Sequence, residues 1–194
     1  MAGLPVEFRG HVTSVGVAKG AVTLPNLFAQ VNGGRVPAGG STGLSDPFED
    51  GVIYPKPGRS RRPNNPKTCH LNAAQSNAHV EHLQDQVDYL VQQVGKEPGL
   101  DVARDWKLLT VFIGANNLLT WCGDGTTSEQ DADKFERYLD EALAGIQARI
   151  PRVLVNLIAL FDAPDAVQPF VKRTAECKSE WDGGGRASGG DWRC

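Results

Sequence analysis

The chain has 194 residues, which suffice for one ordinary domain and are too few for two large ones. Its 20 basic and 23 acidic residues give a net charge of −3, so electrostatics do not favour binding to nucleic acid or to an anionic membrane. Hydrophobic residues make up 40% of the chain and charged residues 22%, a balance that excludes a disordered polyelectrolyte and predicts a soluble globular protein.

Glycine and proline are unevenly distributed along the chain. Residues 1–66 hold 11 glycines and 8 prolines, whereas residues 67–175 hold only 6 and 4. Because both residue types interrupt regular structure, we expect an irregular N-terminal portion, an α/β core over 67–175 and a flexible glycine-rich tail over 176–194. Within the first portion, residues 32–66 predict either a functional loop or a poorly ordered insertion.

The predicted elements of the first half are a helix, a short strand and a second helix. Pro25 suits the first turn of a helix within residues 20–30. Residues 69–74 are compatible with a short strand. Residues 80–94 carry apolar side chains at every third or fourth position, which is typical of one helix face, and Gly95 follows as a stop signal.

The second half alternates between apolar runs and a helical pattern. Residues 108–113 predict a strand buried on both faces, which ends at Gly114. Residues 135–146 predict a helix that Pro151 terminates, and residues 153–160 predict the next buried strand. The order β-α-β-α-β predicts parallel strands joined by right-handed helical crossovers, and therefore an α/β layered fold.

Polar residues follow the two predicted long strands directly. In open parallel sheets, ligands bind beyond the carboxyl ends of the strands, which points to residues 114–117 and 161–162. Gly114 permits a tight exit from the strand, and an asparagine amide at that place could stabilise the oxyanion of an acyl-transfer intermediate. On spacing alone, an Asx-turn made by Asn116 and Asn117 is the simpler interpretation.

The segment 105–118, which reads DWKLLTVFIGANNL, resembles the third block of the GDSL/SGNH esterase superfamily. It is most similar to the phospholipase B branch, which has DWK, an apolar strand and then GGNDL. Other segments resemble that branch in the same order: 7–10, 21–26, 40–43, 71–74, 135–136 and 151–157. The resemblance covers roughly residues 7–175 in pieces.

The resemblance implies a serine hydrolase of lipid esters with a three-layer α/β/α, flavodoxin-like SGNH fold and no cofactor. Such enzymes have a serine in a G-D-S block, a glycine in a second block, an asparagine in the third and a late D-x-x-H. The serine attacks the ester carbonyl, while the histidine takes its proton and the aspartate orients the imidazole. The backbone N–H groups of the serine and the glycine form the oxyanion hole together with the asparagine amide.

Transferred to this chain, the resemblance assigns three site positions. Asn116 matches the oxyanion asparagine, and Gly114 sets the geometry of its loop. Asn77 matches the second-block glycine, so its backbone N–H is the second candidate donor, and asparagine tolerates a positive φ better than most residues. Asn117 stands where the family has aspartate, which removes a charge from the loop.

The other two blocks have no counterpart in the sequence. No G-D-S occurs, no D-x-x-H occurs, and the four histidines are His11, His70, His79 and His82. We therefore assign no nucleophile, no base and no triad aspartate. Ser41 lies in a G-x-S-x-G pattern, but its flanks lack the strand and helix that a nucleophile elbow needs, which favours a glycine-rich loop.

Histidine and cysteine spacing favours neither a metal site nor one disulfide pattern. Cys69, His70, His79 and His82 lack the four-ligand spacing of structural zinc, so a solvated histidine pair is the preferred interpretation and no metal is expected. The four cysteines, Cys69, Cys122, Cys177 and Cys194, allow three disulfide connectivities, all of which stay open. The acidic residues of 124–136 predict a solvated helix start.

The sequence thus leads to one main hypothesis and two alternatives. The main one is a fragment of a phospholipase B-like GDSL lipase, inactive as it stands, with a lipid or small ester as its substrate. The alternatives are a non-catalytic lipid-binding module of the same fold and a truncated product that does not fold. No apolar run reaches the roughly 20 residues that span a bilayer, and residues 1–10 lack a signal pattern, although the family implies an extracellular or membrane-associated place.

Overall fold

The computed structural model describes residues 8–42, 64–118 and 129–160, with side chains from 132 onward in the last range. In chain order these residues form η1 (Arg9–His11), α1 (Leu24–Val31), α2 (Pro66–Cys69), η2 (Val80–His82), α3 (Leu83–Val94), β1 (Lys107–Val111), α5 (Glu129–Arg149) and β2 (Val153–Leu157). Cys122, Cys177, Cys194, the second predicted ligand position at 161–162 and the predicted tail lie outside the described residues. The predicted three-part division of the chain stays a prediction.

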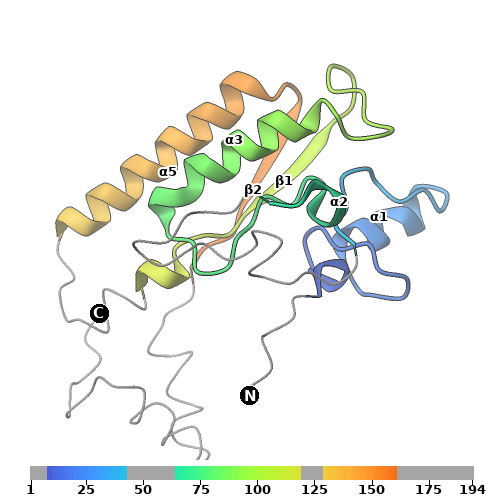
Figure 1. Cartoon of the computed structure of the whole chain (residues 1–194), viewed down its shortest axis with the longest axis horizontal. Coiled ribbons are helices and arrows are strands. Elements are labelled where there is room, and N and C mark those ends of the chain that lie inside the picture. The colour runs from blue at the N-terminus through green and yellow to red at the C-terminus, as the bar shows by residue number, and fades with distance from the viewer. Residues whose placement is uncertain (1–7, 43–63, 119–128, 161–194) are drawn as a thin grey trace, which may run out of the picture.

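The two strands form a parallel pair. Lys107 lies opposite Val153, and the register runs through to Val111 opposite Leu157. α3 and α5 lie side by side along one face of this pair (Figure 1). Parallel strands with packed helices confirm the predicted α/β class, and the described residues contain one helical layer of the expected three-layer fold.

An apolar core joins the two helices to the sheet. Its buried members come from the helix faces that sequence periodicity predicts and from the sheet: Leu83, Val87, Leu90, Val111, Ala142, Ile146 and Ile150. Leu109, Val153 and Val155 pack against this cluster from the sheet. The predicted helix over 80–94 is confirmed from Leu83 as α3, with residues Val80–His82 forming the 3-10 turn η2 instead, and the predicted helix over 135–146 is confirmed as part of α5, which extends to Arg149.

The prediction of strands buried on both faces is wrong. Leu108 and Leu154, which are register partners, are 44% and 63% exposed. They point away from α3 and α5, because successive side chains of a strand alternate between the faces. Within the described residues only one face of the pair has helices packed on it.

The predicted strand over 69–74 is also wrong. Residues Pro66–Cys69 form the short helix α2, because Pro66 suits a first helical turn and the Asn65 side chain accepts a hydrogen bond from the Lys67 N–H at 3.1 Å. His70 then takes a positive φ of 48°, which breaks any extended run.

The predicted N-terminal helix is confirmed as α1. Pro25 occupies its first turn, and the Thr23 hydroxyl accepts a hydrogen bond from the Asn26 N–H at 3.4 Å.

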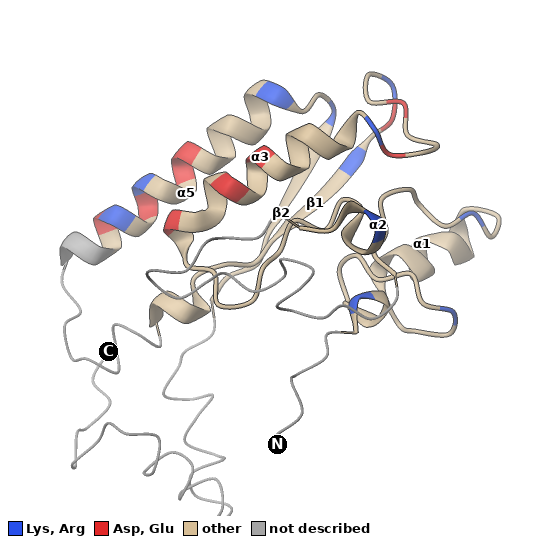
Figure 2. Ribbon diagram, viewed as in Figure 1, with Lys and Arg blue, Asp and Glu red and all other residues tan. Residues whose placement is uncertain are grey.

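The N-terminal region, residues 8–42, contains no acidic residue. Figure 2 shows the acidic residues of the described chain on α3, α5, the η2 turn and the loop between α3 and β1.

Candidate active site

The chain leaves β1 through a glycine that no other residue could replace without strain. Gly114 has φ +107°, a conformation that side chains rarely adopt. A Cβ there would lie 2.6 Å from the Phe135 ring and 2.8 Å from Leu160 Cδ1. Residues 115–118 then form a helical turn, in which the Leu118 N–H donates to Gly114 O at 2.9 Å. This tight exit presents Asn116 and Asn117 at the carboxyl end of β1.

Asn116 connects the third block of the chain to the second. Its side-chain Nδ2 donates a hydrogen bond to the backbone oxygen of Ala78 at 2.9 Å. Ala78 is buried and directly follows Asn77, which takes a left-handed φ of +64°. The two candidate donor positions of the sequence, Asn116 and Asn77, therefore lie next to each other in space although 38 residues separate Asn116 from Ala78.

Asn117 fastens the same loop to η2. The side chain is 3% exposed, and its Oδ1 accepts a hydrogen bond from the Val80 N–H at 2.9 Å. Its Nδ2 donates to Glu81 Oε2 at 3.1 Å. The oxygen and the nitrogen of the Asn117 amide are thus both hydrogen-bonded to the segment that follows Asn77.

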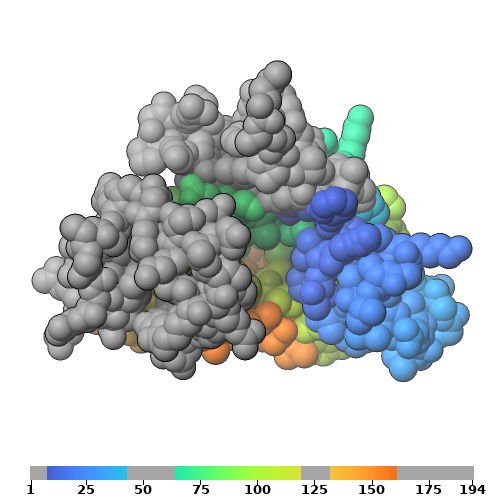
Figure 3. All heavy atoms as spheres, turned by 90° about the horizontal axis from the view of Figure 1, so that it is seen from below, coloured from blue at the N-terminus to red at the C-terminus, as the bar shows by residue number. Residues whose placement is uncertain are grey.

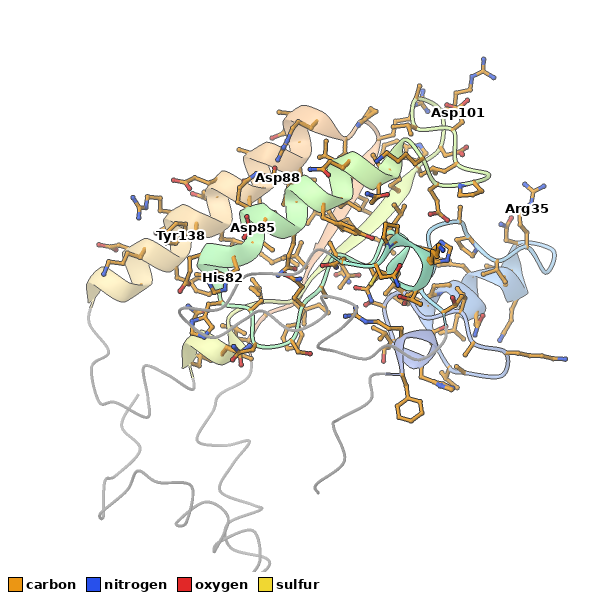
Figure 4. All side chains as sticks on the ribbon, in the orientation of Figure 1. Arg35, His82, Asp85, Asp88, Asp101 and Tyr138 are labelled. Carbon is orange, nitrogen blue, oxygen red and sulfur yellow. The ribbon has the colours of Figure 1, made fainter. Side chains whose placement is uncertain are left out.

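Glu81 lies among polar groups at the start of η2. His79 Nδ1 is 3.4 Å from Glu81 Oε1, and the His79 backbone N–H donates to His82 Nδ1 at 3.0 Å. Burial would raise the pKa of Glu81, but hydrogen bonds from its own backbone and from Asn117, with the charges of His79 and His82, hold it below its usual range. Figure 4 shows His82 near the beginning of α3. The local environment favours a negatively charged Glu81.

A buried polar cluster from the N-terminal region supports the second block. Both terminal nitrogens of Arg9 donate to Ala74 O at 3.2 Å, and Arg9 is 2% exposed. The Asn72 Oδ1 accepts from the Ala74 N–H at 3.2 Å. Ala74 lies three residues before Asn77, so this cluster fixes the approach of the chain to the candidate site.

Ser41 belongs to that cluster and is unsuited to be a nucleophile. It is fully buried, and its hydroxyl donates to the backbone oxygen of Arg9 at 2.8 Å. Its backbone forms an isolated bridge with Gly16, and no strand leads into it within the described residues 8–42. The geometry therefore favours a structural role for Ser41.

The histidines do not assemble a metal site within the described ranges. No group of three or more His, Cys, Asp or Glu residues there is arranged to hold a metal ion. His70 instead lies 3.4 Å from the carboxylate of Glu97, and Glu97 also accepts a hydrogen bond from the Gly39 N–H at 3.0 Å. These contacts join the N-terminal loop to the residues that follow α3.

Sequence reasoning did not identify Arg9 and Glu81 as neighbours of the site. Arg9 contacts a residue 65 positions away, and Asn117 contacts one 36 positions away. Residue spacing in the sequence predicts neither contact, because hydrogen bonds between residues so far apart form only once the chain has folded. The only hint in the sequence was the asparagine at 117 where the family has aspartate.

A parallel strand, a glycine turn beyond its carboxyl end and an asparagine amide held against a second loop form an arrangement suited to acyl-transfer chemistry. The family model described as "GDSL-like Lipase/Acylhydrolase" matches residues 27–182, so the chain belongs to this family of lipid ester hydrolases. This match confirms the resemblance that residues 105–118 indicate.

Curated relatives point to one branch of the family. The chain is 29% identical over 180 residues to the rat protein named "Phospholipase B1, membrane-associated", and 30% and 28% identical over 174 residues to its mouse and human counterparts. These matches cover 91%, 88% and 88% of this chain but only 11%, 10% and 10% of the relatives. The chain thus spans about a tenth of their length. No solved structure matches it, and no described helix is long and apolar enough to cross a membrane.

Proposed function

We propose that this chain contributes the oxyanion-stabilising part of a phospholipase B-like ester hydrolase, and that the 194 residues alone do not hydrolyse esters. The observation that carries the first half of this proposal is the 2.9 Å hydrogen bond from Asn116 Nδ2 to Ala78 O. It fixes the orientation of the amide and brings it beside Asn77. Donors that are fixed before the reaction stabilise developing charge without reorganisation.

The chemistry assigned to these groups is electrostatic. When a nucleophile attacks an ester carbonyl, the carbonyl oxygen becomes negatively charged. The Asn116 amide and the Asn77 backbone N–H are the donors proposed for this oxygen. Gly114 acts indirectly, because its positive φ sets the direction in which the 115–118 turn leaves β1.

The proposed inactivity rests on the residues that supply attack and proton transfer. The sequence contains no G-D-S, no D-x-x-H and no histidine after His82. Ser41, which matches a nucleophile pattern, is buried with its hydroxyl bonded to Arg9 O. Oxyanion donors alone cannot break an ester bond, since they provide neither a nucleophile nor a base.

An assay for serine hydrolase chemistry tests the inactivity. The purified chain is incubated with p-nitrophenyl butyrate, and separately with a fluorophosphonate that labels activated serines. We expect neither turnover above background nor labelling, and the Ser41→Ala variant should behave identically. Stoichiometric labelling, or turnover that Ser41→Ala abolishes, would contradict the proposal.

A carboxylate tests the donors without requiring catalysis. Octanoate is a product-like ligand whose carboxylate can accept hydrogen bonds from oxyanion donors. In a titration followed by nuclear magnetic resonance, the Asn116 side-chain amide and the Asn77 N–H should shift most. Asn116→Ala should weaken binding about tenfold, as expected for loss of a hydrogen bond to a charged group. The matched variant Asn156→Ala, at an exposed position of β2, should bind like the parent.

A second candidate function, non-catalytic lipid binding, is favoured by the surface of α1. Four apolar side chains on or beside this helix are exposed: Val22 (81%), Leu27 (46%), Phe28 (43%) and Val31 (84%). The N-terminal region that carries them forms one flank of the molecule in Figure 3. Co-sedimentation with phosphatidylcholine vesicles that Phe28→Ser abolishes, with no octanoate response at Asn116, would favour this alternative.

A further inference from the structure

The Asn117–Glu81 hydrogen bond joins two side chains that the proposed chemistry does not use. Asn117 is 3% exposed and follows the proposed donor Asn116 directly. Glu81 belongs to η2, three residues after Ala78, whose oxygen holds the Asn116 amide. The hydrogen bonds that hold Asn117 against η2 therefore also set the distance between the Asn116 amide and the segment around Ala78.

The side-chain amide of Asn117 satisfies two contacts of opposite kind, one as acceptor and one as donor. Its Oδ1 accepts from the Val80 N–H at 2.9 Å, and its Nδ2 donates to Glu81 Oε2 at 3.1 Å. An ionised aspartate at 117 could accept the first hydrogen bond but could not donate the second. It would instead place one carboxylate against another, which disfavours ionisation of both.

From this geometry we infer that Asn117 and Glu81 act as a matched positioning pair that holds the Asn116 turn on the segment after Asn77. The uncharged amide at 117 suits a position that a carboxylate faces from residue 81. The inference rests on the proposed function only in taking Asn116 as the donor that is positioned.

The pair also links two elements that the apolar core does not link directly. The 115–118 turn leaves the end of β1, while η2 begins the helical layer, and Figure 1 shows them converging below α3. Asn116 and Asn117 together provide three hydrogen bonds between them, to Ala78, Val80 and Glu81. The Glu81 bond is the only one of the three made to a side chain.

A double-mutant cycle at neutral pH tests the pair. Asn117→Asp should lower the folding equilibrium constant about tenfold, through like-charge repulsion across a hydrogen-bond distance. It should also shift the Asn116 side-chain amide resonance. Adding Glu81→Gln should restore both readouts, because the amide introduced at position 81 can donate to the carboxylate introduced at position 117. The Asn156→Asp variant, with the same chemical change at an exposed position, should alter neither.

The outcomes separate this inference from the proposed function. If Asn117→Asp does not fold, the double variant decides, since it should fold and show the parent Asn116 resonance. The inference is wrong if Asn117→Asp is as stable as the parent, or if Glu81→Gln rescues neither stability nor the resonance. If rescue succeeds but octanoate does not bind the parent chain, the pair stands and the proposed function fails.

Discussion

Two regions of this molecule are held together by different forces. The region formed by α3, α5 and the two strands buries an almost wholly apolar cluster, with Ile146 only 1% exposed. The region formed by residues 8–42 and 64–77 buries polar side chains instead: Arg9, Ser41, Asn64, Asn72 and Gln75 are each less than 7% exposed. Arg9 and Ser41 are hydrogen-bonded to backbone oxygens 65 and 32 positions away, and Asn64 is bonded to the Asn72 backbone oxygen.

The difference matters because the two forces constrain structure differently. Apolar burial is non-directional and stabilises roughly in proportion to the area removed from water. Hydrogen bonds are directional, and a buried group that loses its partner is costly. The polar region ends at Asn77, and Gly114 and Asn116 lie beyond the carboxyl end of β1 in the apolar region. The proposed donors, Asn77 and Asn116, therefore lie where the hydrogen-bonded polar region meets the carboxyl end of β1.

The largest expected effect comes from breaking the apolar region. Ile146→Ala should lower the free energy of unfolding by about 3–4 kcal/mol, since it removes a fully buried side chain and leaves a cavity between the helices and the sheet. Urea unfolding measures this change. Val31→Ala, at a position that is 84% exposed, should change it by less than about 0.5 kcal/mol. Equal effects of the two variants would mean that the core is not where the structure places it.

A smaller and more local effect is expected in the polar region. Arg9→Ala removes the charged donor to Ala74 O and should lower the free energy of unfolding by about 2 kcal/mol. Hydrogen exchange should accelerate at residues 74–78 more than at Ile146. Arg104→Ala, whose side chain is 86% exposed, is the matched control and should leave exchange unchanged. Uniform acceleration across the chain would show that the polar region does not open independently.

The same contrast explains what the sequence could predict. The apolar stripe of residues 80–94 predicts α3 because its period identifies the buried face, and the apolar run 108–113 predicts that a strand exists there but not which face is buried. The exposure of Leu108 and Leu154 was not predictable, since it depends on which elements cover the second face. A hydrophobic run shows that a segment is apolar, but it does not show whether one or both faces of the strand are covered.

The position of the candidate site was predictable from the end of a strand, and its residues Asn116 and Asn77 were predictable from the family resemblance. Gly114 and Asn116 lie a few residues after β1, beyond its carboxyl end, and Asn116 is hydrogen-bonded to the residue that follows Asn77. The short helix at Pro66–Cys69 was missed because the cap provided by Asn65 outweighed a weak apolar pattern. The bond between Arg9 and Ala74 joins residues 65 positions apart, a separation at which single-sequence periodicity carries no signal.

The smallest expected effect is a pH dependence at the junction of the two regions. Burial raises the pKa of Glu81, but hydrogen bonds and the charges of His79 and His82 outweigh it, so the pKa in the folded chain lies below its ordinary value of 4.5. A carboxylate with a lowered pKa stabilises the folded state above its unfolded pKa. This contribution is lost as the pH falls through the folded value.

Glu81→Gln removes this titration. The parent should therefore be the more stable of the two near pH 6, and the difference should shrink as the pH falls below about 4.5. Because the Glu81 side chain is 40% exposed, we expect a difference of only about 0.3 kcal/mol, the scale of a solvent-exposed ion pair. Thermal unfolding from about pH 3 to pH 6 measures it. In an Asn117→Ala background the pH-dependent part should diminish, since one of the hydrogen bonds that lowers the pKa is gone. A difference that grows on acidification would mean that burial outweighs those hydrogen bonds at this junction.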